Sequence, residues 1–155
     1  MKVTRRRGVI RLQLEPIESE LLDGLLDDLD TALGSLSDDD PVRQRLFPAA
    51  YRDDPQAADE FRSLTESSLR EARSERIGAC RTELPAQGGT LALAGDDAER
   101  WLTVLNDVRL GIGTRLDVRE DEYPVVDPAD PQAQARAIYH WLTVLQDSLV
   151  HAAMR

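Results

Sequence analysis

A seven-residue pattern that occurs twice constrains this chain more than any other feature. Residues 101–107 read Trp-Leu-Thr-Val-Leu-Asn-Asp and residues 141–147 read Trp-Leu-Thr-Val-Leu-Gln-Asp, so that only Asn106 and Gln146 differ. Each copy lies in an apolar stripe of helical period, which predicts two core helices with Trp101 and Trp141 buried. A repeat array needs at least about three copies, and nothing in the first 80 residues resembles these two. The pattern therefore predicts two helices of one domain and no solenoid.

The helical period recurs elsewhere in the chain. Amphipathic helices are predicted near residues 17–33, 55–77, 96–117 and 131–153. An Asp-Pro pair stands at the start of the second and of the fourth, and Asp-Asp-Ala-Glu at 96–99 has the form of a capping box for the third. In the second helix, Phe61 and Leu64 belong to the face expected to be buried, and the charged residues of that helix to the face expected in solvent.

Two short apolar segments are candidates for strands. Residues 9–14 alternate apolar and polar side chains and are followed by Pro16, which predicts a strand. Residues 90–94 suit either a strand that pairs with residues 9–14 or a loop. The predicted fold is mainly α, a four-helix bundle-like single domain over residues 1–155, with a small N-terminal β-strand or a ribbon of at most two strands.

Charge is unevenly distributed along the chain. Lys2, Arg5, Arg6, Arg7 and Arg11 give the first twelve residues a charge of +5, whereas the whole chain carries −10, so the remainder carries −15. A body this acidic repels a phosphate backbone and argues against a large nucleic-acid surface. Residues 1–8 are interpreted as a basic N-terminal arm, either one that reaches a nucleic-acid groove through its arginines or a solvated terminus beside a strand.

The residues that carry chemistry assemble into no recognisable active site. Cys80 is the single cysteine, so an intrachain disulfide is excluded, and a lone Asp147/His151 pair does not make a metal site. Neither a phosphate-binding glycine loop nor a nucleophile elbow around Ser148 occurs. No apolar run reaches the about 18 residues of a membrane span. We expect a cytoplasmic protein that needs no cofactor, metal or membrane.

Three smaller features carry structural expectations. Asn106, Asp107 and Arg109 form a candidate buried polar cluster, and the loop at residues 52–54 is its expected neighbour; that loop reads Arg52, Asp53, Asp54. Gly111 and Gly113, inside a predicted helix, indicate that another backbone passes nearby. Cys80 is a candidate redox thiol beside Arg81, which would favour its thiolate, or else an inert buried residue.

Four stretches together resemble one family. They are residues 40–54 (Asp-Pro-Val-Arg-Gln-Arg-Leu-Phe-Pro-Ala-Ala-Tyr-Arg-Asp-Asp), 60–66, 101–110 with 113–116, and 139–147. They are similar to the actinobacterial domain of unknown function numbered 2017 (DUF2017). The resemblance implies an intracellular protein commonly encoded beside the ClpS protease adaptor, with some relatives described as oxidative-stress transcription regulators of the AosR type that respond through two cysteines. This chain has one, so it lacks an intramolecular thiol switch.

Three classes of function follow, in order of preference. The first is a non-enzymatic regulatory module that binds protein partners, with the transcription or Clp machinery indicated by the resemblance. The second is a transcription regulator that contacts DNA through Arg5, Arg6 and Arg7. An enzyme of unknown reaction is third, because the sequence assembles no catalytic site. Homo-oligomer formation is left open.

Overall fold

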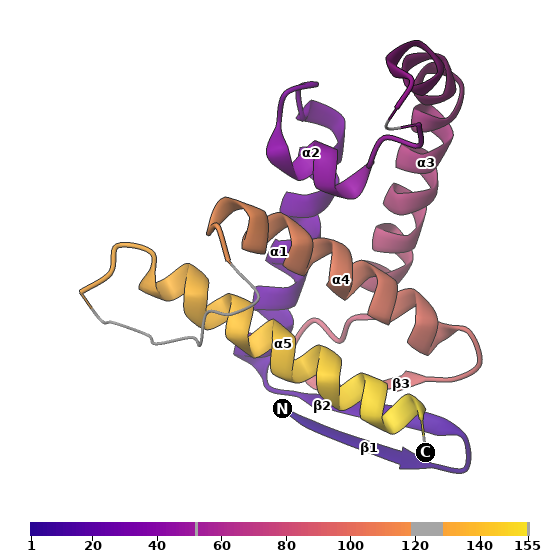
Figure 1. The fold of residues 1–155 in the computed structure, drawn as a ribbon. Coiled ribbons are helices and arrows are strands. Elements are labelled where there is room, and N and C mark those ends of the chain that lie inside the picture. The colour runs from indigo at the N-terminus through magenta and orange to yellow at the C-terminus, as the bar shows by residue number, and fades with distance from the viewer. Residues whose placement is uncertain (52, 119–128, 155) are drawn as a thin grey trace.

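The computed structural model describes residues 1–51, 53–118 and 129–154. Its elements follow one another as β1 (Lys2–Arg6), β2 (Val9–Leu14), α1 (Pro16–Ser35), α2 (Pro41–Leu46), α3 (Pro55–Glu83), β3 (Gly89–Leu93), α4 (Asp97–Arg115) and α5 (Ala133–Ala153). Figure 1 shows the helices lying on one side of the small sheet. The mainly α fold and its four long helices are confirmed, with α2 and a third strand in addition.

The sheet is antiparallel, with strand order β1-β2-β3. Residues 1–8 do not form a free arm, because β1 pairs with β2 from Lys2–Gln13 to Arg6–Val9. Arg7 (φ 53°) and Gly8 (φ 80°) connect the strands, and two positive φ angles suit a tight hairpin whose twist matches the sheet. β3 pairs with the other edge of β2, so the prediction of at most two strands is wrong and the strand alternative for residues 90–94 is confirmed.

The core lies between the inner face of the sheet and helices α1, α4 and α5. One face of α1 and the inward residues of β2 are buried there together with one face each of α4 and α5. On α1 the buried leucines are Leu22, Leu26, Leu29 and Leu33. Its most buried large side chains include Leu12, Leu14, Leu22, Leu26, Leu93, Trp101, Leu105, Leu142, Leu145 and Leu149. Trp101 is fully buried, as expected, and its Nε1 donates to Glu83 Oε2 at 2.8 Å. Trp141 packs at the margin of the core and is only partly buried, so the expectation for it is wrong.

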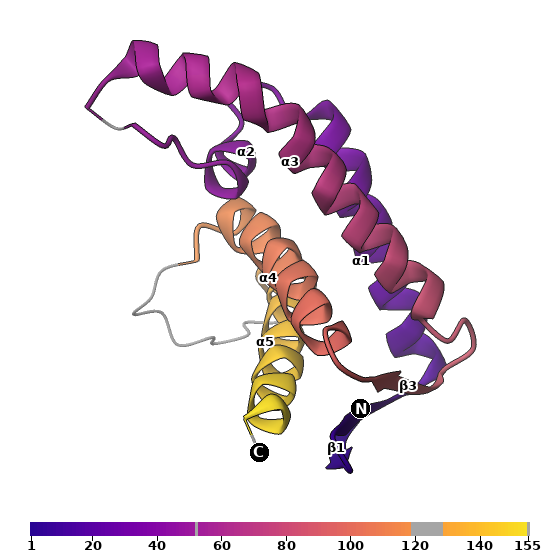
Figure 2. The same ribbon diagram turned by 90° about the vertical axis from the view of Figure 1, so that its right-hand side faces the viewer.

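Helix α3 has two halves with different surroundings. Its C-terminal half packs against α1 and α4 and buries Ile77 and Cys80. Its N-terminal half extends past α1 and α4 beside the short α2, as Figure 2 shows. There Phe61 is 42% exposed and Leu64 is 77% exposed. The prediction that these two residues are buried is therefore wrong.

Of the local signals in the sequence, one helix cap forms as predicted and two other features differ from the prediction. Asp54 caps α3 as expected, by accepting a hydrogen bond from the Ala57 N–H at 3.1 Å. Asp96 makes no capping hydrogen bond at the start of α4, where Asp97 accepts from the Ala94 N–H instead. At Gly113 the close neighbour is a side chain rather than a backbone, because an added Cβ would lie 3.0 Å from the Tyr139 ring.

Candidate protein-interaction surfaces

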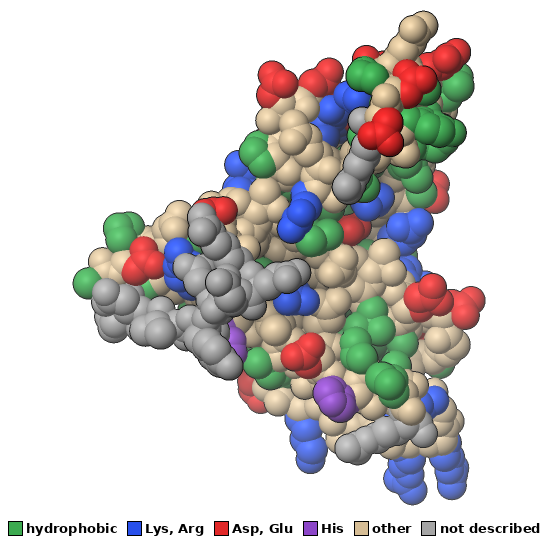
Figure 3. All heavy atoms as spheres, viewed as in Figure 1, with side chains coloured by type: hydrophobic (Ala, Val, Ile, Leu, Met, Phe, Trp, Pro, Cys, Tyr) green, Lys and Arg blue, Asp and Glu red, His purple; other side chains and the backbone are tan. Residues whose placement is uncertain are grey.

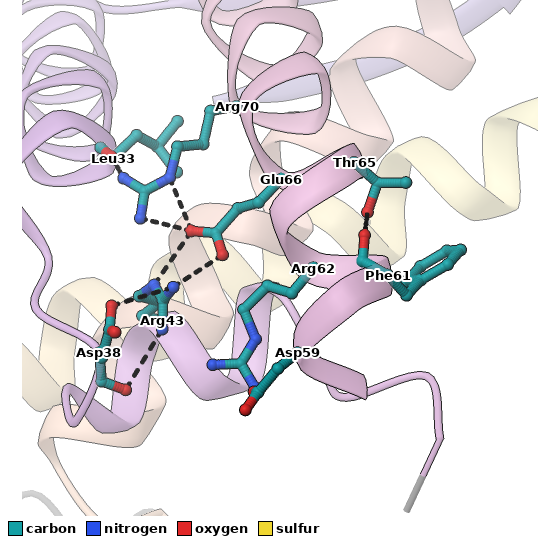
Figure 4. Close-up of polar contacts among 9 residues, drawn as sticks. All are labelled: Leu33, Asp38, Arg43, Asp59, Phe61, Arg62, Thr65, Glu66 and Arg70. Atoms are coloured by element: carbon teal, nitrogen blue, oxygen red, sulfur yellow. Dashed lines mark hydrogen bonds and ion pairs between the residues drawn. The ribbon is translucent and has the colours of Figure 1, made fainter. Parts of the chain in front are cut away.

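The N-terminal half of α3 is attached to the body through charged side chains. Arg43 of α2 is buried and donates to Glu66 from Nε at 3.0 Å and from Nη2 at 2.7 Å. Arg70, one turn after Glu66, donates to the same carboxylate from Nε at 2.9 Å and from Nη2 at 2.7 Å. Figure 4 shows Glu66 held between these two guanidinium groups, with Asp38 on the far side of Arg43. Geometry of this kind gives strong, directional hydrogen bonds.

This ion cluster continues toward α1 and α4. Arg70 donates to the backbone carbonyl of Leu33, near the C-terminal end of α1, where a cation is favourable. The guanidinium groups of Arg70 and Arg73 lie 5.3 and 4.9 Å from the centre of the Phe47 ring. Arg73 in turn forms an ion pair with the buried Asp107 of α4 at 3.1 Å. The charged stripe of α3 is thus its attached side.

The pKa values of two acids of this region, the partly buried Glu66 and the buried Asp107, are shifted in opposite directions. Burial by itself would raise the pKa of Glu66, but the hydrogen bonds and charges of Arg70 and Arg43 together outweigh it and lower that pKa. For Asp107, burial prevails over the attraction of Arg73 and Arg76 and raises the pKa. Glu66 is therefore firmly ionised in the folded protein, and its charge is matched by its neighbours.

Because α3 turns its charged side inward, its apolar side is left uncovered. Tyr51, Phe61 and Leu64, here called the α3 patch, are all exposed, and the Tyr51 and Phe61 rings meet edge to face at 5.9 Å. In Figure 4 Phe61 points away from the ion cluster. The exposed acids Asp53, Asp54, Asp59, Glu60 and Glu71 lie beside the patch in sequence. Figure 3 shows acidic side chains gathered with hydrophobic ones over the start of α3.

The polar cluster predicted around Arg109 is divided by the structure. Asp107 is buried as expected and pairs with Arg73, whereas Asn106 is exposed. Arg109 lies partly buried against α5, where it donates to Gln146 Oε1 and stands 5.3 Å from the centre of the Tyr139 ring. The prediction of Asp53 and Asp54 as neighbours is wrong, because Asp54 caps α3 and Asp53 is exposed. Arg52 lies outside the described residues, so that part stays a prediction. The paired Trp-Leu helices meet here, and Gln146, the one altered position of the repeat, supplies the acceptor.

Cys80 is sealed inside the core. Its side chain is fully buried, and burial, with the nearby charge of Glu83, raises its pKa to about 12. Arg81, which was expected to favour the thiolate, instead pairs with Asp23 at 2.8 Å and Asp27 at 2.6 Å on α1. The geometry fits the inert interpretation, because a thiolate is the reactive form.

The basic residues of β1 are separated by their position on the strand. Arg5 donates to the backbone carbonyls of Ala152 and Ala153 at 3.1 and 2.9 Å and so caps the C-terminal end of α5. Arg6 and Arg7 are exposed, and no ion pair of either is found among the described residues. Figure 3 shows basic side chains projecting below the sheet, at the opposite end from the acidic start of α3.

The remaining candidates make ordinary helix contacts. Ser148 Oγ donates to the Val144 carbonyl at 2.7 Å, and His151 Nδ1 lies 2.8 Å from the Asp147 carbonyl oxygen. In the described part of the chain, no group of three or more His, Cys, Asp or Glu residues is placed to hold a metal ion. None of the described helices is long and apolar enough to cross a membrane.

Comparison with known proteins identifies the chain's family. The profile of the family described as "Domain of unknown function (DUF2017)" matches residues 1–153. The chain belongs to the DUF2017 family. The match spans both Trp-Leu helices, the ion cluster and the sheet, so the architecture described above is that of a DUF2017 domain.

Curated proteins similar in sequence to this DUF2017 protein are named as regulators. The chain is 32% identical to the "Oxidative stress regulator AosR" of Mycobacterium tuberculosis and of Mycobacterium bovis, over 97% of this chain and 85% of the relative. It is also 32% identical to the "Putative oxidative stress regulator AosR" of Mycobacterium leprae, over 75% of this chain and 59% of that protein. No solved structure matches this DUF2017 chain.

Proposed function

We propose that this DUF2017 protein is a non-enzymatic regulator that acts by binding a protein partner through the α3 patch. The observation that carries the proposal is the orientation of the N-terminal half of α3, whose charged stripe is used to attach it to the body. Phe61 and Leu64 on this extended helix, with Tyr51 from the loop before it, are left in solvent. Aromatic and aliphatic side chains displayed this way are typical anchors of protein interfaces.

The surroundings of the patch define the chemistry of the partner. Asp53, Glu60 and Glu71 are exposed on the same half of α3 or just before it, and the chain as a whole carries −10. A partner surface with an apolar centre and Lys or Arg around it would be attracted to this end of the molecule. A second copy of the chain would bring acidic rims together, so a different, basic protein is the better occupant.

Names of relatives support regulation as the biological role. Mycobacterial relatives are named oxidative stress regulators, and we extend participation in that response to this chain. Here the signal would have to arrive through the partner, because Cys80 is buried and its pKa is raised. A regulator's name also favours a non-enzymatic role.

The test compares one double variant with a single-variant control in an affinity experiment. The immobilised chain, with Phe61→Ser and Leu64→Ser, is compared with wild type and with a Leu69→Ser control for proteins retained from an actinobacterial lysate. Leu69 is also exposed (44%), and because it comes five residues after Leu64 it lies on a different stripe from Leu64 in a helix of about 3.6 residues per turn. We expect at least one protein to be lost with the patch variant and kept with the control, and to bind in purified form with salt-sensitive affinity. Identical retention by all three forms would refute the proposal.

Direct DNA contact is the competing function. Its basis is weaker than the sequence indicated, because residues 2–6 are a strand in the sheet and cannot reach into a groove as a free arm. Promoter DNA titrated at physiological salt, with a scrambled duplex as control, tests it. Sub-micromolar binding that prefers the promoter would replace the proposal made here.

A further inference from the structure

β1 has an open edge, and its unused backbone groups can be placed from the register. β2 lies on one side of β1, and no strand lies on the other among the described residues. Arg6 pairs with Val9 across the two-residue turn, and in such a hairpin the pair beside the turn exchanges both hydrogen bonds while the next pair exchanges none. Val3 and Arg5 therefore direct their N–H and C=O groups toward the open side. These groups are available to another strand.

Helix α5 lies beside this open edge, on the inner face of the sheet. A groove runs between the strand residues Val3 and Arg5 and the helix residues Val144, Ser148 and His151. The helix residues are spaced four and three apart, so they form one stripe along α5. Val144 is 42% exposed although it belongs to the second Trp-Leu repeat. A fourth strand added to β1 would lie under this stripe, as β1 and β2 already lie under the rest of α5.

The position of α5 over the groove is held by β1 itself. Arg5 donates to the carbonyls of Ala152 and Ala153, so the last turn of α5 is tied to the strand below it. Such a fixed strand-and-helix groove is the arrangement in which an extended peptide binds by adding to a sheet edge. Backbone pairing supplies affinity in that mode, and alternate side chains of the peptide supply specificity.

We propose that the groove between β1 and α5 binds an extended, acidic segment of another protein as a fourth strand of the sheet. Charge selects this occupant. Arg5 and Arg7 line the groove, and Asp147 is the one acid among its described lining residues. Lys2, Arg6 and Arg11 are exposed on the same two strands. Lys and Arg on an edge strand discourage pairing with neutral or basic strands. A second copy would set β1 against β1 and align like charges, whereas acidic side chains would be matched.

The first arm of the test uses designed peptides and the full chain. A fluorescein-labelled peptide Glu-Val-Glu-Val-Glu-Val-Glu is titrated by anisotropy, beside a Lys-Val counterpart and a Glu-Val peptide with every backbone nitrogen methylated, so that neither edge of the peptide can donate to β1. We expect saturable binding of the first peptide and at least about tenfold weaker binding of the other two, a difference of about 1.4 kcal/mol. Absence of saturable binding, or equal binding of the methylated peptide, would overturn the proposal.

The second arm uses substitutions of residues that line the groove. Val144→Glu puts a negative charge in the groove and should weaken the acidic peptide at least tenfold. Val150→Glu is its control, because Val150 is also exposed on α5 (37%) but is not a groove residue. Val3→Pro removes an outward N–H, which an edge strand tolerates, and should also abolish binding while circular dichroism stays unchanged.

Amide exchange distinguishes strand addition from attraction by charge alone. On adding the acidic peptide, exchange at the outward amides of Val3 and Arg5 should slow, while Thr4 and Arg6, already paired with β2, should change little. Strand addition would be overturned if the peptide binds wild type without slowing amide exchange at Val3 and Arg5, and Arg6→Glu abolishes that binding. The peptide would then be held by charge alone. Substitutions in the α3 patch should not affect these results, so this proposal and the proposed function can fail separately.

Discussion

Replacing Glu66 with leucine tests directly how the N-terminal half of α3 is attached. Glu66 accepts from two nitrogens of Arg43 and two of Arg70, all at 2.7–3.0 Å. Its side chain is 13% exposed and that of Arg43 is 9% exposed, so removing the carboxylate leaves Arg43 with the solvated Asp38 as its remaining acid. Breaking a buried pair from one side costs about 3–5 kcal/mol. We expect about 3 kcal/mol, because Arg70 is 25% exposed and can turn toward water.

The assay is urea denaturation at neutral pH, followed by circular dichroism and tryptophan fluorescence. Glu71→Leu is the matched control: Glu71 is exposed on the same helix and its loss should change the free energy of unfolding by less than about 0.5 kcal/mol. The double variant Arg43→Met/Glu66→Leu should recover most of the loss, since apolar replacement of a whole buried pair is often neutral or favourable. A change below about 1 kcal/mol for Glu66→Leu, or no recovery in the double variant, would refute the reasoning.

The same carboxylate should make stability depend on pH. Because the pKa of Glu66 is lowered in the folded protein, the unfolded chain binds the proton more tightly. Its contribution is complete above the unfolded pKa, near 4.5, and is lost as the pH falls through the lower folded value. Glu66→Gln should therefore lose less stability on acidification than wild type, as measured by urea denaturation across this range. Parallel curves for the two proteins would contradict this.

Three further outcomes follow from the packing. Trp101→Ala should cost about 3–5 kcal/mol, whereas Trp141→Ala should cost about 1–2 kcal/mol because it is only partly buried; equal losses in urea would contradict the burial. Gly111→Ala should stabilise α4 by about 0.5–1 kcal/mol, since the nearest atom to the added Cβ, Val42 Cγ1, would be 3.8 Å away. Gly113→Ala should stabilise it less, because the added Cβ would lie 3.0 Å from the Tyr139 ring. Thermal melts of the two variants and wild type test this. Cys80 should resist a thiol reagent at neutral pH until the protein unfolds, because its pKa is about 12; fast labelling of the native protein would show access to the thiol.

The sequence predicted those elements whose burial follows from their own pattern. Leu22 and Leu26 on α1, and Leu12 on β2, repeat at the period of their element and are fully buried. The sequence does not predict β1, because Val3 is its one apolar residue. One apolar side chain is too few to give an alternating pattern. The pairing of β1 becomes visible only in the structure, where β2 has β1 on one side and β3 on the other.

The orientation of α3 could not be predicted from its own residues. Its N-terminal half carries an apolar stripe and a charged stripe, and periodicity alone assigns the apolar one to the core. The decision is made by Arg43 on another helix, which is buried and requires a carboxylate. Glu66 and Arg70 at i,i+4 suit a solvated face and a buried pair equally well. For the same reason the α3 patch was not recognised as a surface from sequence.

Because α3 is attached by its charged side, the residues that stabilise the helix differ from those that it exposes to a partner. In most helices selection for stability and selection for binding act on the same residues. In most amphipathic helices the large apolar side chains hold the helix in place, so that changing them changes stability. Here Phe61 and Leu64 face solvent while Arg43, Glu66 and Arg70 hold the helix. Homologous chains that keep the ion cluster can therefore vary the exposed side of α3 at little cost in folding. Divergence in partner choice among such proteins would leave its trace at these positions, with the core unchanged.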